Sequence, residues 1–189
     1  MKPVRPRDLK LFEFDETEKL LGEIPRSHIG LLFIFFNGLM LGVVLLVLQF
    51  YAVRYEDSTQ EMFNLRADMD LAGLITGLVL LIIVLILAGS LAAAYIYINS
   101  YIILTDQKLV LISTKGIFAR RISQLSIGDI QDVTVDQNSF LSRIFNYGNI
   151  NIETSGEQAN FTFSLAHDPN QNGKYIVDAH EQNLKMYGN

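Results

Sequence analysis

The chain has 189 residues, of which 50% are apolar, and its mean hydropathy is +0.26. Its 15 basic and 20 acidic side chains give a formal charge of −5, which argues against binding to a nucleic-acid backbone. Because the sequence contains no cysteine, a disulfide scaffold, a thiolate metal site and a cysteine nucleophile are all excluded. So much apolar weight in a chain of this size predicts segments that lie in lipid.

The first apolar segment follows a polar N-terminal stretch, residues 1–27, that lacks the apolar core of a signal peptide. We interpret that stretch as a cytoplasmic juxtamembrane segment. Residues 29–53 carry no formal charge, and as a helix they would rise about 37 Å, enough to cross a hydrocarbon core of about 30 Å. A second uncharged span covers residues 71–97. The two spans predict a transmembrane hairpin over residues 28–98, with an external loop at 54–70.

The basic residues predict the orientation of this hairpin. The loop has two, Arg54 and Arg66, beside five acids, whereas the segment before the first span has six and the tail after Ile98 has seven. Both termini should therefore face the cytoplasm. Neither span contains a charged residue, which argues against a transporter or an ion path.

Both spans contain pairs of glycines at the spacing that lets helices approach closely, Gly38/Gly42 and Gly73/Gly77. Matching depth in an antiparallel hairpin puts Gly38 opposite residues 86–89. One pair can then close the hairpin while the other contacts a second subunit. The alternative is that glycine is simply frequent in membrane helices.

After residue 98 the sequence changes to short segments with the alternation of half-buried strands. The expected strands are 101–105, 108–114, 117–127, 130–137, 149–154 and 161–166. In all, the sequence after residue 98 has room for six or seven short strands. Asp168 and Pro169 then open a final helix. Its expected apolar stripe consists of Ile176, Val177, His180, Leu184 and Tyr187. Residues 99–189 are thus predicted to form one small cytoplasmic domain of strands with a capping helix.

Several motifs resemble the bacterial pleckstrin-homology-like (PH-like) family, formerly called the membrane-flanked domain. They are LTDQKL (104–109), the turn at Gly116, IGDIQDVTVDQ (127–137), LSRIFNYGNINIETSG (141–156) and the helix that begins at Pro169. The most specific portion is the junction of Arg143, Phe145, Tyr147 and Gly148, followed by Thr154 and Gly156. The resemblance implies a bent, seven-stranded antiparallel barrel closed by a C-terminal helix. It also implies the plasma membrane of a bacterium. The chain departs from the family's usual pattern in having one such domain rather than tandem copies.

No catalytic constellation appears in the sequence. His28, His167 and His180 have no carboxylate spacing that suggests a metal site, and we expect them to be boundary, capping and packing residues. Asp129, Asp132 and Asp136 lack a calcium-binding loop and are expected to be solvated charges. We therefore predict no enzyme activity, no metal and no cofactor.

Two groups of residues are candidates for binding. Lys108, Lys115, Arg120 and Arg121 form the basic cluster, which can face anionic lipid; general surface contact or plain solvation is favoured over recognition of a specific headgroup. In residues 140–148, the apolar side chains Phe140, Leu141, Ile144 and Phe145 are expected to pack under the barrel. The alternative is an exposed aromatic anchor for a partner, with Tyr147 as the residue that remains outside.

These observations favour a membrane-anchored interaction or scaffold module at the inner face of the membrane. Its expected partners are the lipid bilayer and either a membrane protein or a second copy of the chain, with no nucleic acid. The alternative is recognition of anionic lipid headgroups by the PH-like domain.

Overall fold

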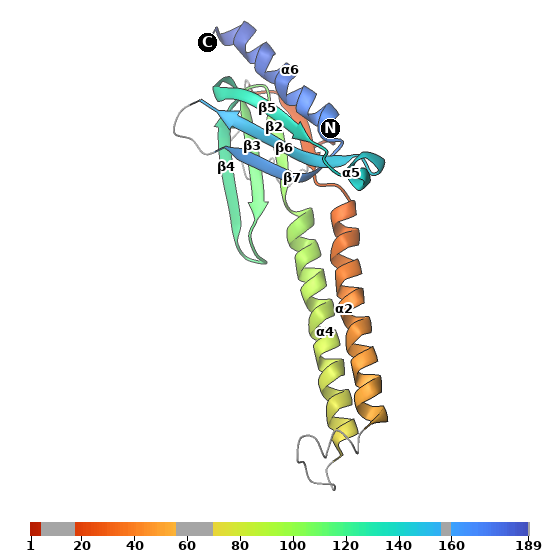
Figure 1. The fold of residues 1–189 in the computed structure, drawn as a ribbon. Helices are drawn as coiled ribbons and strands as arrows, with labels where there is room; N and C mark the ends of the chain where they lie inside the picture. The colour runs from red at the N-terminus through yellow and green to blue at the C-terminus, as the bar shows by residue number, and fades with distance from the viewer. Residues whose placement is uncertain (5–17, 56–69, 156–159, 189) are drawn as a thin grey trace. The chain divides into compact units, whose positions relative to one another are not determined.

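The computed structural model describes residues 1–4, 18–55, 70–155 and 160–188 (Figure 1). The chain divides into two compact units. Residues 31–94 form the helical unit, and residues 1–30 together with 95–189 form the sheet unit.

The helical unit is built from α2 (Ile29–Arg54) and α4 (Leu71–Ile98). Both helices are long and apolar enough to cross a bilayer, and they are therefore candidate membrane spans. Each helix lies within one residue of the stretch that the uncharged runs predicted. Residues 56–69 of the expected external loop lie outside the described residues.

The sheet unit contains two antiparallel sheets. The first sheet is β1 (Leu20–Pro25), β2 (Tyr101–Thr105), β3 (Lys108–Thr114) and β4 (Arg120–Ser126), in that order. The second is β5 (Ile130–Asp136), β6 (Tyr147–Thr154) and β7 (Phe161–His167). A 3-10 turn, η1 (Ile127–Asp129), joins the sheets; α5 (Phe140–Ile144) links β5 to β6, and α6 (Pro169–Tyr187) ends the fold.

The two sheets do not close into the barrel that was expected. The strands β4 and β5 belong to different sheets and are connected through η1 instead of pairing with one another. On the other side, an isolated bridge between Arg26 and Ala166 links the end of β1 to β7. The described residues therefore hold seven strands in two separate sheets: six at the positions expected after residue 98, and β1, which was not expected.

The strand β1 comes from the segment before α2, residues 1–27, which the sequence predicts to be a juxtamembrane segment separate from the domain at 99–189. It pairs with β2, placing Ile24 opposite Ile102 and Pro25 opposite Tyr101. Ile24 is fully buried in the core. Because β1 is an edge strand, Pro25 costs the sheet no internal hydrogen bond. The sheet unit is therefore assembled from two stretches of chain on either side of the helices.

The main core lies between the two sheets and α6. Ile102 of β2, Ile150 of β6 and Ile176 of α6 are at most 1% exposed and belong to one hydrophobic cluster. The helix α6 begins at Pro169 as predicted and packs along β5 and η1 (Figure 1). Val177, expected in the buried stripe, is instead exposed.

The entry into α6 differs from the expected cap. Asp168 has a left-handed backbone conformation, with φ of 45°, and its side chain makes no capping hydrogen bond. Instead, the Asn172 amide donates to the carbonyl oxygen of His167 at 2.6 Å. The preset φ of Pro169 and this side-chain contact stabilise the first turn.

Candidate functional site

The sheet unit has one edge at which the chain enters and leaves the helices, and we call it the junction edge: residues 26–28 and 98–100. The Tyr97 hydroxyl donates a hydrogen bond to the Ser27 carbonyl oxygen at 2.7 Å. The Tyr97 ring occupies the space where any side chain at Gly30 would lie, so only glycine fits there. These contacts tie the first turn of α2 to the last turn of α4.

Arg26 is the arginine of the junction edge. Its guanidinium lies over two rings, 5.2 Å from the centroid of Tyr97 and 5.5 Å from that of Phe163. Burial lowers the pKa of Arg26 from its ordinary value because the charged form loses hydration. Its Nε atom is buried without a hydrogen-bond partner in the described part of the chain. The aromatic faces therefore supply the electrostatic contacts of this cation.

The backbone beside Arg26 is bent to meet β7. Leu165 has a positive φ of 55°, a conformation uncommon for a residue with a branched side chain. Its carbonyl oxygen accepts a hydrogen bond from the Ser27 N–H at 2.7 Å, and its own N–H donates to Asn149 Oδ1 at 3.2 Å. These two hydrogen bonds offset the strain and hold the start of α2 against β7.

The structure separates the four predicted cations. Lys108 begins β3 opposite Ser126, and its Nζ lies 3.4 Å from Glu18 Oε2. Lys115 follows the other end of β3, about 23 Å away along an extended strand. Arg120 and Arg121 lie beside Lys115 at the start of β4. Three of the four cations therefore come together, and Lys108 belongs to a different end of the sheet.

The turn between β3 and β4 also carries exposed apolar side chains. We call residues 115–121 the β3–β4 tip. Ile117 is 56% exposed and Phe118 is fully exposed, at 101%. The sequence predicts a strand over 117–127, but β4 begins only at Arg120, so residues 117–119 lie in the turn instead. The N–H groups of Lys115 and Gly116 instead donate to the Ala119 carbonyl oxygen at 2.8 and 3.2 Å, which closes the turn.

The short helix α5 differs most from the expected packing. The four apolar side chains in α5 and at its C-terminal cap are all exposed: Phe140 78%, Leu141 43%, Ile144 57% and Phe145 49%. The expectation that they pack under the barrel is therefore wrong, and we call them the α5 patch. The alternative of an exposed anchor named Tyr147 as the residue that remains outside, but Tyr147 is only 8% exposed.

The capping of α5 explains why the side chains of the α5 patch are exposed and not packed under the sheets. Ser139 and Ser142 form a reciprocal capping box, and Ser142 is the buried residue of the helix. Gln137 Nε2 donates to the carbonyl oxygens of Ser142 and Tyr147, at 3.3 and 3.1 Å. Because the polar side of this one-turn helix is bonded to its own loop, the apolar side chains face outward.

The α5 patch lies close to the junction edge. β6 begins at Tyr147, which pairs with His167, and the next residue, Gly148, pairs with Ala166. Ala166 in turn bridges to Arg26. The sheet register therefore brings the loop that contains α5 to the side of the sheet unit where α2 begins.

Within the helical unit, the four glycines of interest have different surroundings. A Cβ atom at Gly38 would lie 2.5 Å from Ser90 Oγ and 3.7 Å from Ile86, close to the depth predicted for the opposite helix. At Gly42 and Gly77, no described atom beyond the helix's own backbone and chain neighbours lies within 4 Å of such a Cβ. The N–H of Gly73 donates to Asp70 Oδ1 at 2.9 Å, which marks the start of α4.

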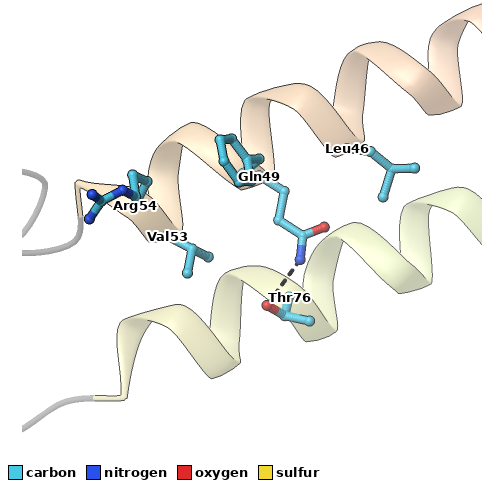
Figure 2. Close-up of a pocket in the computed structure, with 6 residues that line it drawn as sticks. Leu46, Gln49, Val53, Arg54 and Thr76 are labelled. Atoms are coloured by element: carbon cyan, nitrogen blue, oxygen red, sulfur yellow. Dashed lines mark hydrogen bonds between the residues drawn. The ribbon is translucent and has the colours of Figure 1, made fainter.

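A cavity of about 390 Å³ lies between α2 and α4 (Figure 2). Its lining residues are Leu46, Gln49, Phe50, Val53, Arg54 and Thr76. Gln49 Nε2 donates to Thr76 Oγ1 at 3.1 Å, as the dashed line in Figure 2 shows. The two uncharged polar side chains thus bond to one another across the helices.

His180 and Asp136 each make a hydrogen bond within the sheet unit. His180 Nδ1 lies 2.7 Å from the Ile127 carbonyl oxygen, which fixes α6 to η1. Asp136 accepts a hydrogen bond from Asn151 Nδ2 at 2.7 Å. Among the residues that the structure describes, no group of three or more His, Asp or Glu is arranged to hold a metal ion.

Comparison with known proteins gives one family. A model described as "Bacterial PH domain" matches residues 11–171. A solved structure of a DUF1696 family protein with a pleckstrin-homology domain, from Shewanella loihica PV-4, is 19% identical. The similarity covers 44% of this chain and 73% of that one, with a TM-score of 0.36. No curated protein matches.

Proposed function

The chain belongs to the bacterial PH domain family, and we propose that it is a membrane-anchored interaction module that binds a membrane protein or a second copy of itself. In this proposal α2 and α4 cross the plasma membrane, and the sheet unit and both termini lie on the cytoplasmic side. The scarcity of basic residues between the helices supports that orientation. The role is one of binding rather than turnover.

The observation that carries the proposal is the α5 patch. Four large apolar side chains lie exposed within six consecutive residues, on a helix held by its own capping box. Contiguous exposed apolar surface of this kind marks interaction sites, and aromatic residues are enriched among those that contribute most to binding. Because α5 is already ordered by Ser139 and Ser142, little conformational entropy remains to be lost on binding.

The location of the patch favours a partner in the same membrane. Through Gly148 and Ala166, α5 is connected to the side of the sheet unit from which α2 begins. The two helices confine each copy to the plane of the bilayer, which raises the effective concentration of any partner held in that plane. A weak contact through the α5 patch can then produce a populated assembly.

Recognition of anionic headgroups is the second candidate. It is supported by the three cations of the β3–β4 tip, Lys115, Arg120 and Arg121, but not by Lys108, which is paired with Glu18. This arrangement suits contact with a charged surface better than a pocket that surrounds one headgroup.

The proposal is tested by measuring the mass of the full chain in lipid nanodiscs and in detergent-free extracts of its native membrane. We expect a dimer or a complex with a membrane protein. Replacing Phe140 and Ile144 together with serine should weaken that assembly by tenfold or more, on the order expected when central interface side chains are removed. Val177→Ser, which changes an exposed apolar residue of α6, serves as the matched control.

A chain that is monomeric and partner-free in both preparations would contradict the proposal. If such a monomer also bound anionic vesicles, and Arg120→Ala with Arg121→Ala removed that binding, headgroup recognition would replace it. An assembly unaffected by the α5 double substitution would show that the α5 patch is not the contact.

A further inference from the structure

We infer that the β3–β4 tip inserts into the headgroup layer of the same membrane that the helices cross, with Ile117 and Phe118 as the apolar point and the neighbouring cations on anionic lipid. The inference takes from the proposed function only that α2 and α4 span the membrane. It does not depend on the α5 patch or on any protein partner. It assigns the tip to a lipid surface, not to a pocket for one headgroup.

The side chains of the tip have the chemistry of a membrane-contacting loop. Phe118 is fully exposed and Ile117 is more than half exposed, although both are large and apolar. Lys115, Arg120 and Arg121 flank them, and residues 115–121 contain no acid. An apolar point surrounded by cations matches the interface of an anionic leaflet, where apolar side chains enter the acyl boundary and cations remain among phosphates.

The sheet register sets the height of the tip within the sheet unit. Thr114, the last residue of β3, donates its N–H to Ser100 Oγ at 3.1 Å and its hydroxyl to the Asn99 carbonyl oxygen at 2.7 Å. The end of β3 is therefore level with the first residues after α4, which ends at Ile98.

From Thr114 the tip extends further along the strand direction. Lys115 and Ala119 face each other across the closed turn, and at most about two residues lie beyond them. At about 3.3 Å per residue, Phe118 reaches up to about 10 Å past the level of Asn99. The headgroup layer on each side of a bilayer is about 5 to 8 Å thick, so this reach is sufficient to enter it.

The tip is held in place by contacts with the sheet. The Lys115 and Gly116 N–H groups donate to the Ala119 carbonyl oxygen, and Arg120 Nη2 donates to Tyr101 Oη at 2.8 Å. Tyr101 is the fully buried first residue of β2, directly after the junction edge. The exposed side chains are thus presented on an ordered turn, which reduces the entropy lost on insertion.

Lipid fits this surface better than a protein does. A stable protein interface buries on the order of 800 Å² on each partner, and two apolar side chains at the end of one turn supply much less. A bilayer needs no matching surface, and Thr114, the residue before the tip, is hydrogen-bonded to Asn99, the first residue after α4. The two exposed side chains are therefore sufficient for a lipid contact.

The chain has no native cysteine, so single labels can be introduced into the full protein in vesicles. A fluorophore on Ala119→Cys reports the tip, one on Gln124→Cys reports the opposite end of β4, and one on Leu91→Cys reports the body of α4. The vesicles contain phosphatidylcholine and phosphatidylglycerol, with a nitroxide lipid as the quencher. We expect quenching at positions 119 and 91 and little at position 124.

Two sets of substitutions then separate the apolar and the ionic contributions. Ile117→Ser with Phe118→Ser should lower quenching at position 119 to the level of position 124. Lys115→Ala with Arg121→Ala should do so only partly, and replacing phosphatidylglycerol by phosphatidylcholine should have a similar effect in the unsubstituted tip. Circular dichroism of each variant checks that the sheets remain folded.

The outcomes distinguish this inference from the proposed function. If position 91 is quenched but position 119 is not, the tip does not contact lipid and the inference fails while the membrane anchor stands. If position 91 is not quenched, the helices are not inserted and the proposed function fails with it. If quenching at 119 is weak at high protein density and rises when the protein is diluted into excess lipid, a second copy covers the tip at high density and the lipid assignment is overturned.

Discussion

The helical unit and the sheet unit use apolar residues in opposite ways. In the sheet unit, Ile24, Ile150 and Ile176 are fully buried between sheets and helix. In the helical unit, residues of the same chemistry, such as Leu39 at 65% and Leu91 at 64%, lie on the outside. One region is stabilised by removing apolar surface from water, and the other leaves that surface on the outside, as expected of candidate membrane spans.

The comparison teaches which side chains specify the packing of each unit. In the sheet unit, the packing is specified by many interdigitated side chains, because any cavity in a packed core lowers stability. In the helical unit, most outward side chains are interchangeable, and specificity depends on a few contacts such as Gly38 with Ser90 and Gln49 with Thr76. Three pairs of substitutions test this difference.

The largest effect is expected from Ile24→Ala in β1. The side chain is fully buried against Ile102 and its neighbours, so its removal should lower the free energy of unfolding of the sheet unit by about 2–5 kcal/mol. Leu39→Ala, on the outside of α2, should change that quantity by less than about 0.5 kcal/mol. Urea titration of the full chain, followed by protease sensitivity of the sheet unit, measures both. Equal losses from the two substitutions would contradict the comparison.

A smaller effect is expected from Gly38→Ala in α2. The added Cβ would lie 2.5 Å from Ser90 Oγ, and separating the helices to relieve this contact should lower their stability by about 1–3 kcal/mol. Gly42→Ala, one turn along the same helix, meets no described atom of the other helix within 4 Å and should be nearly neutral. Titration of the reconstituted chain with a denaturing detergent compares the two. A neutral Gly38→Ala would show that α2 and α4 are not packed at this point.

The smallest effect is expected from Gln49→Leu. It removes the hydrogen bond to Thr76, and such bonds between membrane helices contribute about 0.6 kcal/mol on average. Asn37→Leu is the control, because the Asn37 amide donates to the Phe33 carbonyl oxygen of its own helix at 2.8 Å. The same detergent titration should separate Gln49→Leu from the control. If Asn37→Leu is the more harmful change, the polar contact between the helices does not stabilise the pair.

Local patterns were sufficient to predict several elements. The uncharged runs predicted α2 and α4 within one residue, because a long apolar segment has few stable alternatives to a helix. Strict alternation predicted the strands β5, β6 and β7, and Pro169 predicted the start of α6. The family was identified from the motifs around Gly116, Tyr147 and Pro169, and a family model matches the chain over residues 11–171.

The candidate sites were harder to predict. The sequence grouped Lys108 with Lys115, but seven residues of extended strand hold them at opposite ends of β3. It assigned the α5 side chains to the core because their spacing is helical, and helical spacing does not say which face is covered. The signal for the exposed face was available in Ser139 and Ser142, which bond to each other's backbone and turn the polar side of α5 inward.

By itself, the sequence determined what depends on neighbours along the chain: two apolar helices, the alternating strands and the turn-and-proline start of the last helix. Only the tertiary structure decided what depends on pairing between distant segments. It placed Leu20–Pro25 in the sheet across the two intervening helices, left the sheets separate and brought Thr114, at the end of β3, beside Asn99. The physical reason is that strand pairing joins backbones irrespective of their separation in sequence. The strand β1 contains Gly22, Glu23 and Pro25 among its six residues, so its local pattern is too weak to predict that it is a strand or that it pairs with β2.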